Sequence, residues 1–195
     1  ILLQFQKSNV LFFESQNMQP EKEFLVGSKT VKIYRDECAE NPFEDWDLEG
    51  LIWARFGRDA REGELKSPSI KDLTREDLLS RDTSKKYHVF PLYAYVHSGV
   101  TVSLTPFSCP WDSGQCGVIL VPRKRGRTSA IARKIAQDTA KIANQFVQGE
   151  VYYFTVTGPD ATDLDSCGGL YGAEYAEEEA RCAAERAEIS LEVCP

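Results

Sequence analysis

The sequence predicts an α+β domain with a mostly antiparallel sheet, one long amphipathic helix and a C-terminal helix packed on that sheet. Short apolar runs between turn residues are typical of strands, and segment 127–148 has helical periodicity. Strands and helices do not alternate as they do in parallel α/β folds. The 195 residues suffice for one well-buried core, so we expect a single domain over residues 21–190. Residues 1–20 are expected to be an N-terminal arm or strand, or a remnant of cloning or processing, and residues 191–195 a loose tail.

Strands are expected where β-branched and aromatic residues gather between turns. The Gly-Ser pair at 27–28 predicts a turn between two short strands, and Gly99 suits the turn of a later hairpin. Trp53 is expected in the core, and the polar segment 57–68 is expected to be an exposed loop. A long connection over 105–115 then links neighbouring strands. The expected strands lie in segments 23–34 (two strands), 51–56, 87–96, 100–104, 117–121 and 151–157, and a short strand or a turn is expected around 165–171.

Three helices are expected. Segment 71–80 is expected to form a short helix in which Thr74 and Asp77 form a local hydrogen bond. Segment 127–148 is expected to be capped by Thr128 or Ser129 and ended by Gly149. Its apolar stripe is predicted to consist of Ile131, Ile135, Ile142 and Phe146, with Ala132, Ala136 and Ala143 beside it. The last helix, over 173–189, is expected to pack through a face of small residues, namely Ala176, Ala180, Ala183 and Ala187.

Charge is distributed unevenly along the chain. The net charge is −7, and a short basic run over 123–134 separates two acidic segments. This negative net charge argues against general nucleic-acid affinity. No apolar segment approaches the length of about 20 residues that a helix needs to cross a bilayer. The acidic segments are either solvated faces or surfaces that meet a basic partner. The first segment carries seven acids and no Lys or Arg: Asp36, Glu37, Glu40, Glu44, Asp45, Asp47 and Glu49.

Side chains suited to chemistry gather in segment 87–121. The loop FSCPWDSGQCG suggests a cysteine nucleophile, Cys109 or Cys116, activated by His97 and oriented by Asp112. Gln115 or backbone amides would stabilise an oxyanion. His88 is a weaker base because strand alternation places it apart from His97. A turn needs the same Asp, Ser and Gly residues anyway, so a purely structural role accounts for the loop without any chemistry.

Cysteine and glycine spacing does not predict a cofactor. The six cysteines are scattered and form no CxxC pair, which favours reduced structural thiols and gives no familiar metal site. The glycine-rich segment 165–172 lacks the lysine and the spacing of a phosphate-binding loop. We therefore expect no metal and no cofactor.

Five short motifs lie along the chain: ENP with WD at 40–47, PLYAY at 91–95, HSG at 97–99, FSC with WDSGQ at 107–115, and DSC with YG at 165–172. Together they resemble a family of small uncharacterised proteins that bacteriophages and other mobile elements encode. The resemblance covers residues 36–180 and implies an origin in a phage or plasmid and a location in the host cytoplasm, but no activity. In that family an aliphatic residue commonly follows the glutamine of WDSGQ and a Trp commonly follows DSC, whereas Cys116 and Gly168 stand here. The first difference argues against Cys116 as a required nucleophile.

These observations lead to one principal hypothesis. The chain is expected to be an acidic, non-enzymatic binding protein of a phage or mobile element, located in the host cytoplasm. It would inhibit a host antiviral defence protein, such as a CRISPR or restriction component, by occupying a basic surface. The expected partner-binding residues are the seven acids of segment 36–49 together with Trp111. No membrane and no direct nucleic-acid contact are expected.

Two alternatives belong to different classes. The first is a cysteine-dependent hydrolase or transferase that uses His97, Cys109 and Asp112. The second is a structural or regulatory domain that forms a homodimer through a sheet edge or through the alanine-rich last helix.

Overall fold

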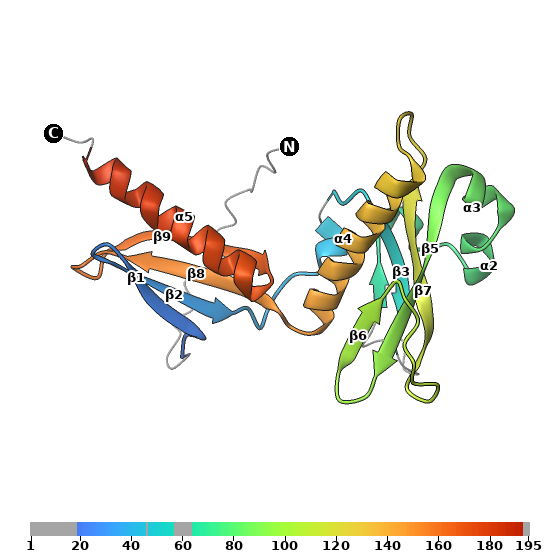
Figure 1. Cartoon of the computed structure of the whole chain (residues 1–195), viewed down its shortest axis with the longest axis horizontal. Coiled ribbons are helices and arrows are strands. Elements are labelled where there is room, and N and C mark those ends of the chain that lie inside the picture. The colour runs from blue at the N-terminus through green and yellow to red at the C-terminus, as the bar shows by residue number, and fades with distance from the viewer. Residues whose placement is uncertain (1–18, 46, 57–63, 193–195) are drawn as a thin grey trace. The chain divides into compact units, whose positions relative to one another are not determined.

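A computed structural model describes residues 19–45, 47–56 and 64–192, and these form two compact units (Figure 1). The terminal unit comprises the described residues up to Ala39 and from Glu150 onwards, and the central unit comprises Glu40–Gly149. The arm predicted over residues 1–20 lies outside the described residues except for its last two positions. The range predicted as one domain, 21–190, thus contains two units, each with its own sheet.

The predicted α+β class with antiparallel strands is confirmed, since every strand pairing is antiparallel. The strands belong to two sheets, however, and each of the two long helices packs on a different one. Strand positions follow from local patterns, whereas strand partners depend on contacts between residues far apart in the chain. The sequence therefore predicted the α+β class but not the division of the strands between two sheets.

The terminal unit is a four-stranded sheet with one helix packed on it (Figure 1). Ala176, Ala180, Ala183 and Ala184 of this helix are buried against the sheet, as the small-residue face predicted, while Ala187 is half-buried. The helix continues to Glu192, so the predicted loose tail is helical at its first two residues. The strands, in sheet order, are β1 Lys22–Val26, β2 Lys29–Arg35, β8 Val151–Thr157 and β9 Asp163–Tyr171, and the helix is α5 Ala173–Glu192.

The central unit is a five-stranded sheet with the long helix α4, Ser129–Val147, on one face. Residues of η1 and α2 pack on the other face, and Figure 1 shows α3 beside α2. The strands, in sheet order, are β4 Glu64–Lys66, β3 Leu51–Arg55, β7 Ser113–Pro122, β5 Tyr87–Val96 and β6 Val100–Ser103. The short helices are α1 Pro42–Asp45, the 3₁₀ helix η1 Pro68–Ile70, α2 Arg75–Leu78 and α3 Arg81–Lys86.

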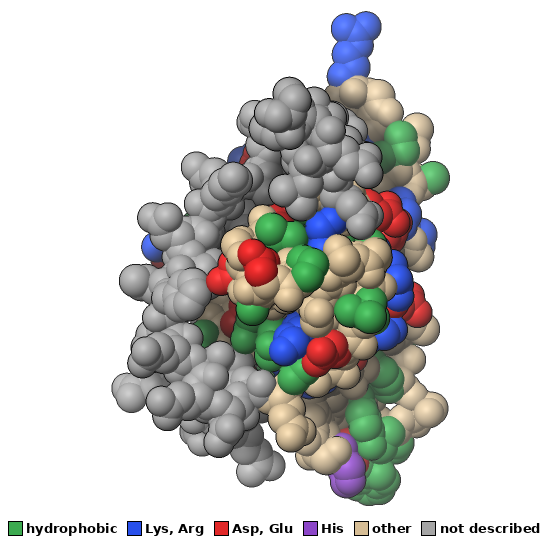
Figure 2. All heavy atoms as spheres, turned by 90° about the vertical axis from the view of Figure 1, so that its left-hand side faces the viewer, with side chains coloured by type: hydrophobic (Ala, Val, Ile, Leu, Met, Phe, Trp, Pro, Cys, Tyr) green, Lys and Arg blue, Asp and Glu red, His purple; other side chains and the backbone are tan. Residues whose placement is uncertain are grey.

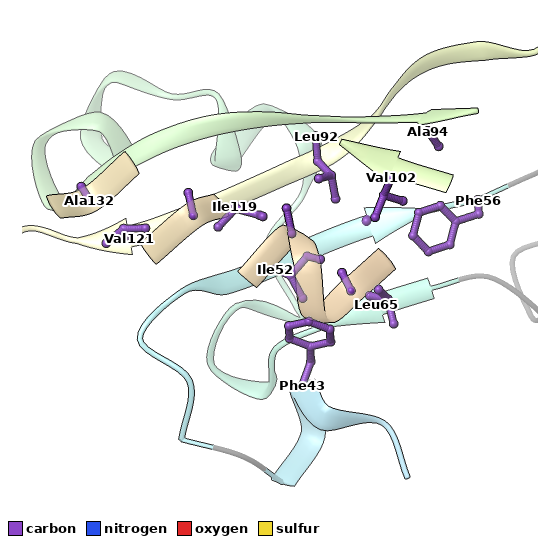
Figure 3. Packing of buried hydrophobic residues seen from close by; sticks show 14 residues of the cluster. Phe43, Ile52, Phe56, Leu65, Leu92, Ala94, Val102, Ile119, Val121 and Ala132 are labelled. Atoms are coloured by element: carbon purple, nitrogen blue, oxygen red, sulfur yellow. The ribbon is translucent and has the colours of Figure 1, made fainter. Parts of the chain in front are cut away.

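The core of the central unit lies between α4 and the sheet (Figure 3). Figure 3 shows Phe43 reaching from α1 toward Ile52 of β3 and Leu65 of β4. The Phe43 side chain is 2% exposed, so it fixes the acidic segment around it to the core. β4 lies within segment 57–68, and the prediction of an exposed loop there was wrong for residues 64–66.

The helix α4 approaches the sheet more closely than its predicted stripe implied. Ala132, Ala136 and Ala143 are buried, whereas Ile131 is 48% exposed, so the prediction that Ile131 belongs to the core-facing stripe was wrong. A Cβ on Gly50 would lie 2.1 Å from Oγ1 of Thr139 on this helix. Only small side chains fit at so short a separation, and the larger Ile and Phe residues therefore pack at the flanks.

β7 is the central strand of its sheet, and it begins earlier than predicted. Residues 118–121 are buried on both faces of the sheet, but the strand starts at Ser113 and pairs there with Tyr95. The predicted connection over 105–115 accordingly ends at residue 112. On the other side of β5, β6 pairs only with residues 93–96, and Pro91 lies on the stretch that no other described strand covers.

Candidate functional site

The structure brings the three residues predicted for chemistry to one end of the central sheet. His97 lies in the turn between β5 and β6, where its backbone N–H donates to the Gly99 carbonyl at 3.1 Å. Asp112 directly precedes β7, and its carbonyl accepts the Val96 N–H at 2.8 Å. Pairing of β5 with β7 thus places the β5–β6 turn beside the loop that holds Cys109. We call residues 95–99 and 105–112 the loop end.

The carboxylate of Asp112 lies between the other two side chains. Its Oδ2 is 3.6 Å from Nδ1 of His97 and accepts from Sγ of Cys109 at 3.9 Å. The Ser113 hydroxyl donates to the Cys109 carbonyl and fixes the bend. In a cysteine nucleophile the histidine contacts the thiol and the carboxylate contacts the histidine. Here Asp112 contacts the thiol directly, and this order of contacts supports a role in holding the loop.

The second cysteine of the motif is enclosed by the sheet. Sγ of Cys116 lies 3.5 Å from the Leu92 carbonyl, and burial raises the pKa of this thiol to about 12. The Gln115 side-chain amide donates to the Gly117 carbonyl at 3.3 Å, so one of its two N–H groups already has a partner in the same strand. Cys116 is therefore a protonated thiol near neutral pH and lacks the thiolate that a nucleophile requires.

Cys116 is expected to react slowly with alkylating reagents in the folded protein. With a pKa of about 12, the thiolate is only about 0.01% of this group at pH 8. We expect peptide-resolved labelling with iodoacetamide to be at least about tenfold slower at Cys116 than at the exposed Cys38, and the rate to rise with pH up to the pKa. Labelling in urea should make the two rates equal. Equal rates in the folded protein would contradict the described burial.

Trp111 is the most exposed large hydrophobic residue described. Its side chain is 90% exposed, and the neighbouring Val96 is 40% exposed. Tyr95 forms ring contacts with His97 and Phe107, with ring centroids 6.2 and 5.9 Å apart. The loop end therefore carries an exposed indole and, separately, a group of three rings that contact one another. The sequence pointed to Trp111 but missed Tyr95 and Phe107. For Tyr95 the available signal was its alternation with the buried Leu92 and Ala94 along β5.

The acids predicted for partner binding are divided between the two units. Asp36 and Glu37 belong to the terminal unit, whereas the other five belong to the central unit, where the side chain of Asp45 lies outside the described residues. Glu49 forms ion pairs with Arg127, just beyond the last residue of β7, and with Lys124 at 3.7 Å. Trp111 lies before the first residue of that 10-residue strand, and a strand of this length spans about 30 Å.

Several of these acids already have partners. The Glu44 carboxylate accepts from the Asn41 amide at 3.1 Å, and the Asp36 carboxylate accepts from the Cys38 backbone N–H at 3.1 Å. In the described part of the face shown in Figure 2, acidic and basic side chains are interspersed with hydrophobic ones. The described part of that face therefore shows no continuous acidic patch.

The second histidine lies at the opposite end of the central sheet. Nε2 of His88 is 3.3 Å from Nη1 of Arg123. Burial lowers the pKa of His88, and the positive charges of Arg123 and Arg127 lower it further. His88 pairs with Val121 near the end of β7, whereas His97 lies beyond the start of that strand, so the two histidines do not share a site.

The residues that the structure describes contain no candidate for a metal site or for a membrane-spanning helix. No three His, Cys, Asp or Glu side chains there are grouped so that they could hold a metal ion. None of the described helices has the length and apolar character needed to cross a membrane. The chain matches no protein-family model, no curated protein and no solved structure.

Proposed function

We propose that this chain is a non-enzymatic binding protein whose loop end inserts Trp111 into a partner protein. The observation that carries the proposal is the 90% exposure of the Trp111 side chain on a loop held by hydrogen bonds. An exposed indole on a fixed loop loses little conformational entropy when it is buried by a partner. Tryptophan is also among the residues that contribute most to protein interfaces.

The loop end has the layout of a small interface centre. Trp111 would enter an apolar pocket of the partner. Tyr95 and Phe107 would contact the partner surface around that pocket and exclude water from it. Asp112 and His97 would form the polar rim, because their side chains are 41% and 68% exposed. A partner with an apolar pocket bordered by basic residues complements this arrangement.

The partner that we propose is a host antiviral defence protein with a basic surface, such as a CRISPR or restriction component. Two observations support this choice. The motifs resemble those of phage and mobile-element proteins, and the net charge of −7 favours association with a basic surface. The chain would act as an inhibitor in the host cytoplasm by occupying that surface.

Loss of the Trp111 side chain is expected to abolish inhibition. The assay uses bacteria with an active CRISPR or restriction system and counts plaques of a phage that the system targets. The wild-type chain should restore plaque formation, whereas Trp111→Ala should not, because loss of a central indole raises Kd by at least about 30-fold. Folding should be unaffected, since this side chain is 90% exposed.

Leu25→Ala is the matched control, because Leu25 is 69% exposed on β1 of the other unit. It should restore plaques as the wild type does. If Trp111→Ala also restored them, the loop end would not be the binding surface. If the wild-type chain restored none against any system tested, the inhibitor proposal would fall. Light scattering of the same proteins shows whether the wild type forms a homodimer that Trp111→Ala abolishes. Such a homodimer would overturn the proposal that a host protein binds at this surface.

A cysteine-dependent hydrolase or transferase is the second candidate, because His97, Cys109 and Asp112 do converge. Their contacts run from thiol to carboxylate to imidazole, which is not the order that activates a thiol. The variant Cys109→Ala separates the candidates in the same plaque assay. A binding protein should keep its inhibition, and an enzyme should lose it.

A further inference from the structure

Exposed Lys and Arg side chains gather where β7 ends and before α4 begins. Two segments meet there, the end of α3 and the connection between β7 and α4, since the Arg123 N–H donates to the Lys86 carbonyl at 2.9 Å. Figure 1 shows this connection projecting past the end of the central sheet. We call residues 84–86 and 122–127 the basic end. Its exposed cations are Lys85, Lys86, Arg123, Lys124 and Arg125.

Hydrogen bonds fix the backbone of this connection. The Arg127 N–H donates to the Lys124 carbonyl at 3.0 Å and closes a turn. Gly126 has a φ of +81° in that turn, which favours glycine. Nε of Arg123 donates to the Ser84 carbonyl at 3.1 Å and ties the connection to α3. A connection held in this way loses little conformational entropy when a partner binds to it.

Three of the exposed cations have no acidic partner. Lys86, Arg123 and Arg125 form no ion pair with any residue that the structure describes. The carboxylates of Glu49 and Asp82 reach this end, but they pair with other Lys and Arg side chains of the same two segments. The basic end therefore keeps an excess of positive charge.

The acidic excess of the chain lies outside the central unit. Residues 40–149 contain 16 Lys and Arg against 14 Asp and Glu, which gives this unit a net charge of +2. The sequence-based argument against nucleic-acid contact used the net charge of the whole chain, −7. That argument does not hold for the unit that carries the basic end, because phosphate binding depends on local positive charge.

The basic end lacks the apolar centre of a protein interface. None of the exposed large hydrophobic side chains among the described residues lies within it. It also has no aromatic side chain on which the bases of a single strand could stack. Guanidinium and ammonium groups are the donors that phosphate oxygens prefer. This combination is suited to the phosphate backbone of a duplex.

We propose that the basic end binds the phosphate backbone of double-stranded nucleic acid without reading its base sequence. Lys86, Arg123 and Arg125 would donate to phosphate oxygens and displace counterions from them. The basic end and the loop end lie at opposite ends of the 10-residue strand β7, so both can be occupied at once. This binding does not depend on the function proposed for Trp111.

Fluorescence anisotropy of labelled duplexes of about 20 base pairs tests this binding. Duplex DNA, duplex RNA and single-stranded DNA are titrated with the full chain at several NaCl concentrations. At least one duplex should bind, and the tighter of the two identifies the nucleic acid. Its log Kd should rise with log salt concentration with a slope of about 3, one for each unpaired cation. A duplex of unrelated sequence should bind equally.

Lys86→Gln combined with Arg125→Gln should weaken duplex binding at least about tenfold and lower the salt slope by about 2. Both side chains are exposed, so the fold should persist. Lys32→Gln combined with Lys141→Gln is the matched control. It removes the same charge from β2 of the terminal unit and from the C-terminal half of α4. The control should bind as the wild type does.

The proposal is overturned if neither duplex binds at about 100 µM protein and low salt. It is also overturned if the double variant at Lys86 and Arg125 binds normally, if the control weakens binding equally, or if the single strand binds more tightly than both duplexes. Competition by poly-glutamate as strong as that of unlabelled duplex would indicate an acidic protein partner instead. Trp111→Ala should leave duplex binding unchanged, so failure of this proposal can be distinguished from failure of the loop-end interface.

Discussion

Replacing Gly117 with alanine is expected to destabilise the central unit by at least about 3 kcal/mol. A Cβ at this position would lie 2.1 Å from the Trp53 carbonyl oxygen and 2.7 Å from Cα of Ala54. Both atoms belong to the backbone of β3, which pairs with β7 at this point. The clash can be relieved only by separating the two strands, because neither atom is at the end of a flexible side chain.

Urea unfolding followed by circular dichroism measures this effect. Gly114→Ala is the matched control, since Gly114 lies in the same strand and a Cβ there would meet nothing within 4 Å. Its free energy of unfolding should stay within about 1 kcal/mol of the wild type. Similar unfolding midpoints for both variants would show that β3 and β7 are not as close as described.

Replacing Phe43 with alanine is expected to lower the free energy of unfolding by about 3–5 kcal/mol. The ring is 2% exposed and belongs to the core cluster that contains Ile52 and Leu65. Its removal would leave a cavity where the short helix α1 meets the sheet. The segment that carries five of the seven acids would then lose its attachment to the core.

Phe107→Ala provides the comparison for this variant, because Phe107 is only partly buried and lies at the loop end. The same urea experiment should give a loss of less than about 2 kcal/mol for it. Equal losses for the two variants would contradict the position of Phe43 in the core. Proteolysis within the acidic segment should accelerate only for Phe43→Ala.

The elements that the sequence predicted well have strong local signals. The pattern VYYFTVT predicted β8 with its exact bounds, and the Gly-Ser pair predicted the turn between β1 and β2. Thr128 caps α4, where its hydroxyl accepts the Ile131 N–H at 3.3 Å, and Gly149 ends the helix region with a φ of +66°. Such caps depend only on residues that are close in sequence, so they can be predicted without knowledge of the tertiary structure.

The elements that were missed depend on distant partners. Residues 113–116 of β7 contain little apolar surface, and they are a strand because β5 pairs with them. The short strand β4 exists because it pairs with β3. Ile131 was assigned to the apolar stripe because a helical wheel considers only the angle and the hydropathy of each residue. The close approach of Gly50 to Thr139, which favours small residues, involves positions far apart in the chain.

The candidate site was predicted in part. The turn residues of the loop end correctly indicated that His97, Cys109 and Asp112 lie close together, because the hairpin and the start of β7 bring them to one end of the sheet. The order of their contacts depends on side-chain geometry that spacing does not fix. The basic run over 123–134 was visible in the sequence, but its contact with Lys86 could not be foreseen, since α3 and the connection after β7 are far apart in the chain.

Pro91 has a consequence for how this chain behaves beside copies of itself. Along residues 87–92, β5 has β7 on one side and no described strand on the other. A row of free backbone donors and acceptors there would be a template for a strand from another molecule, the first step toward aggregation. A proline offers no N–H and interrupts that row. The residue thus keeps a sheet with an open side from growing at high protein concentration.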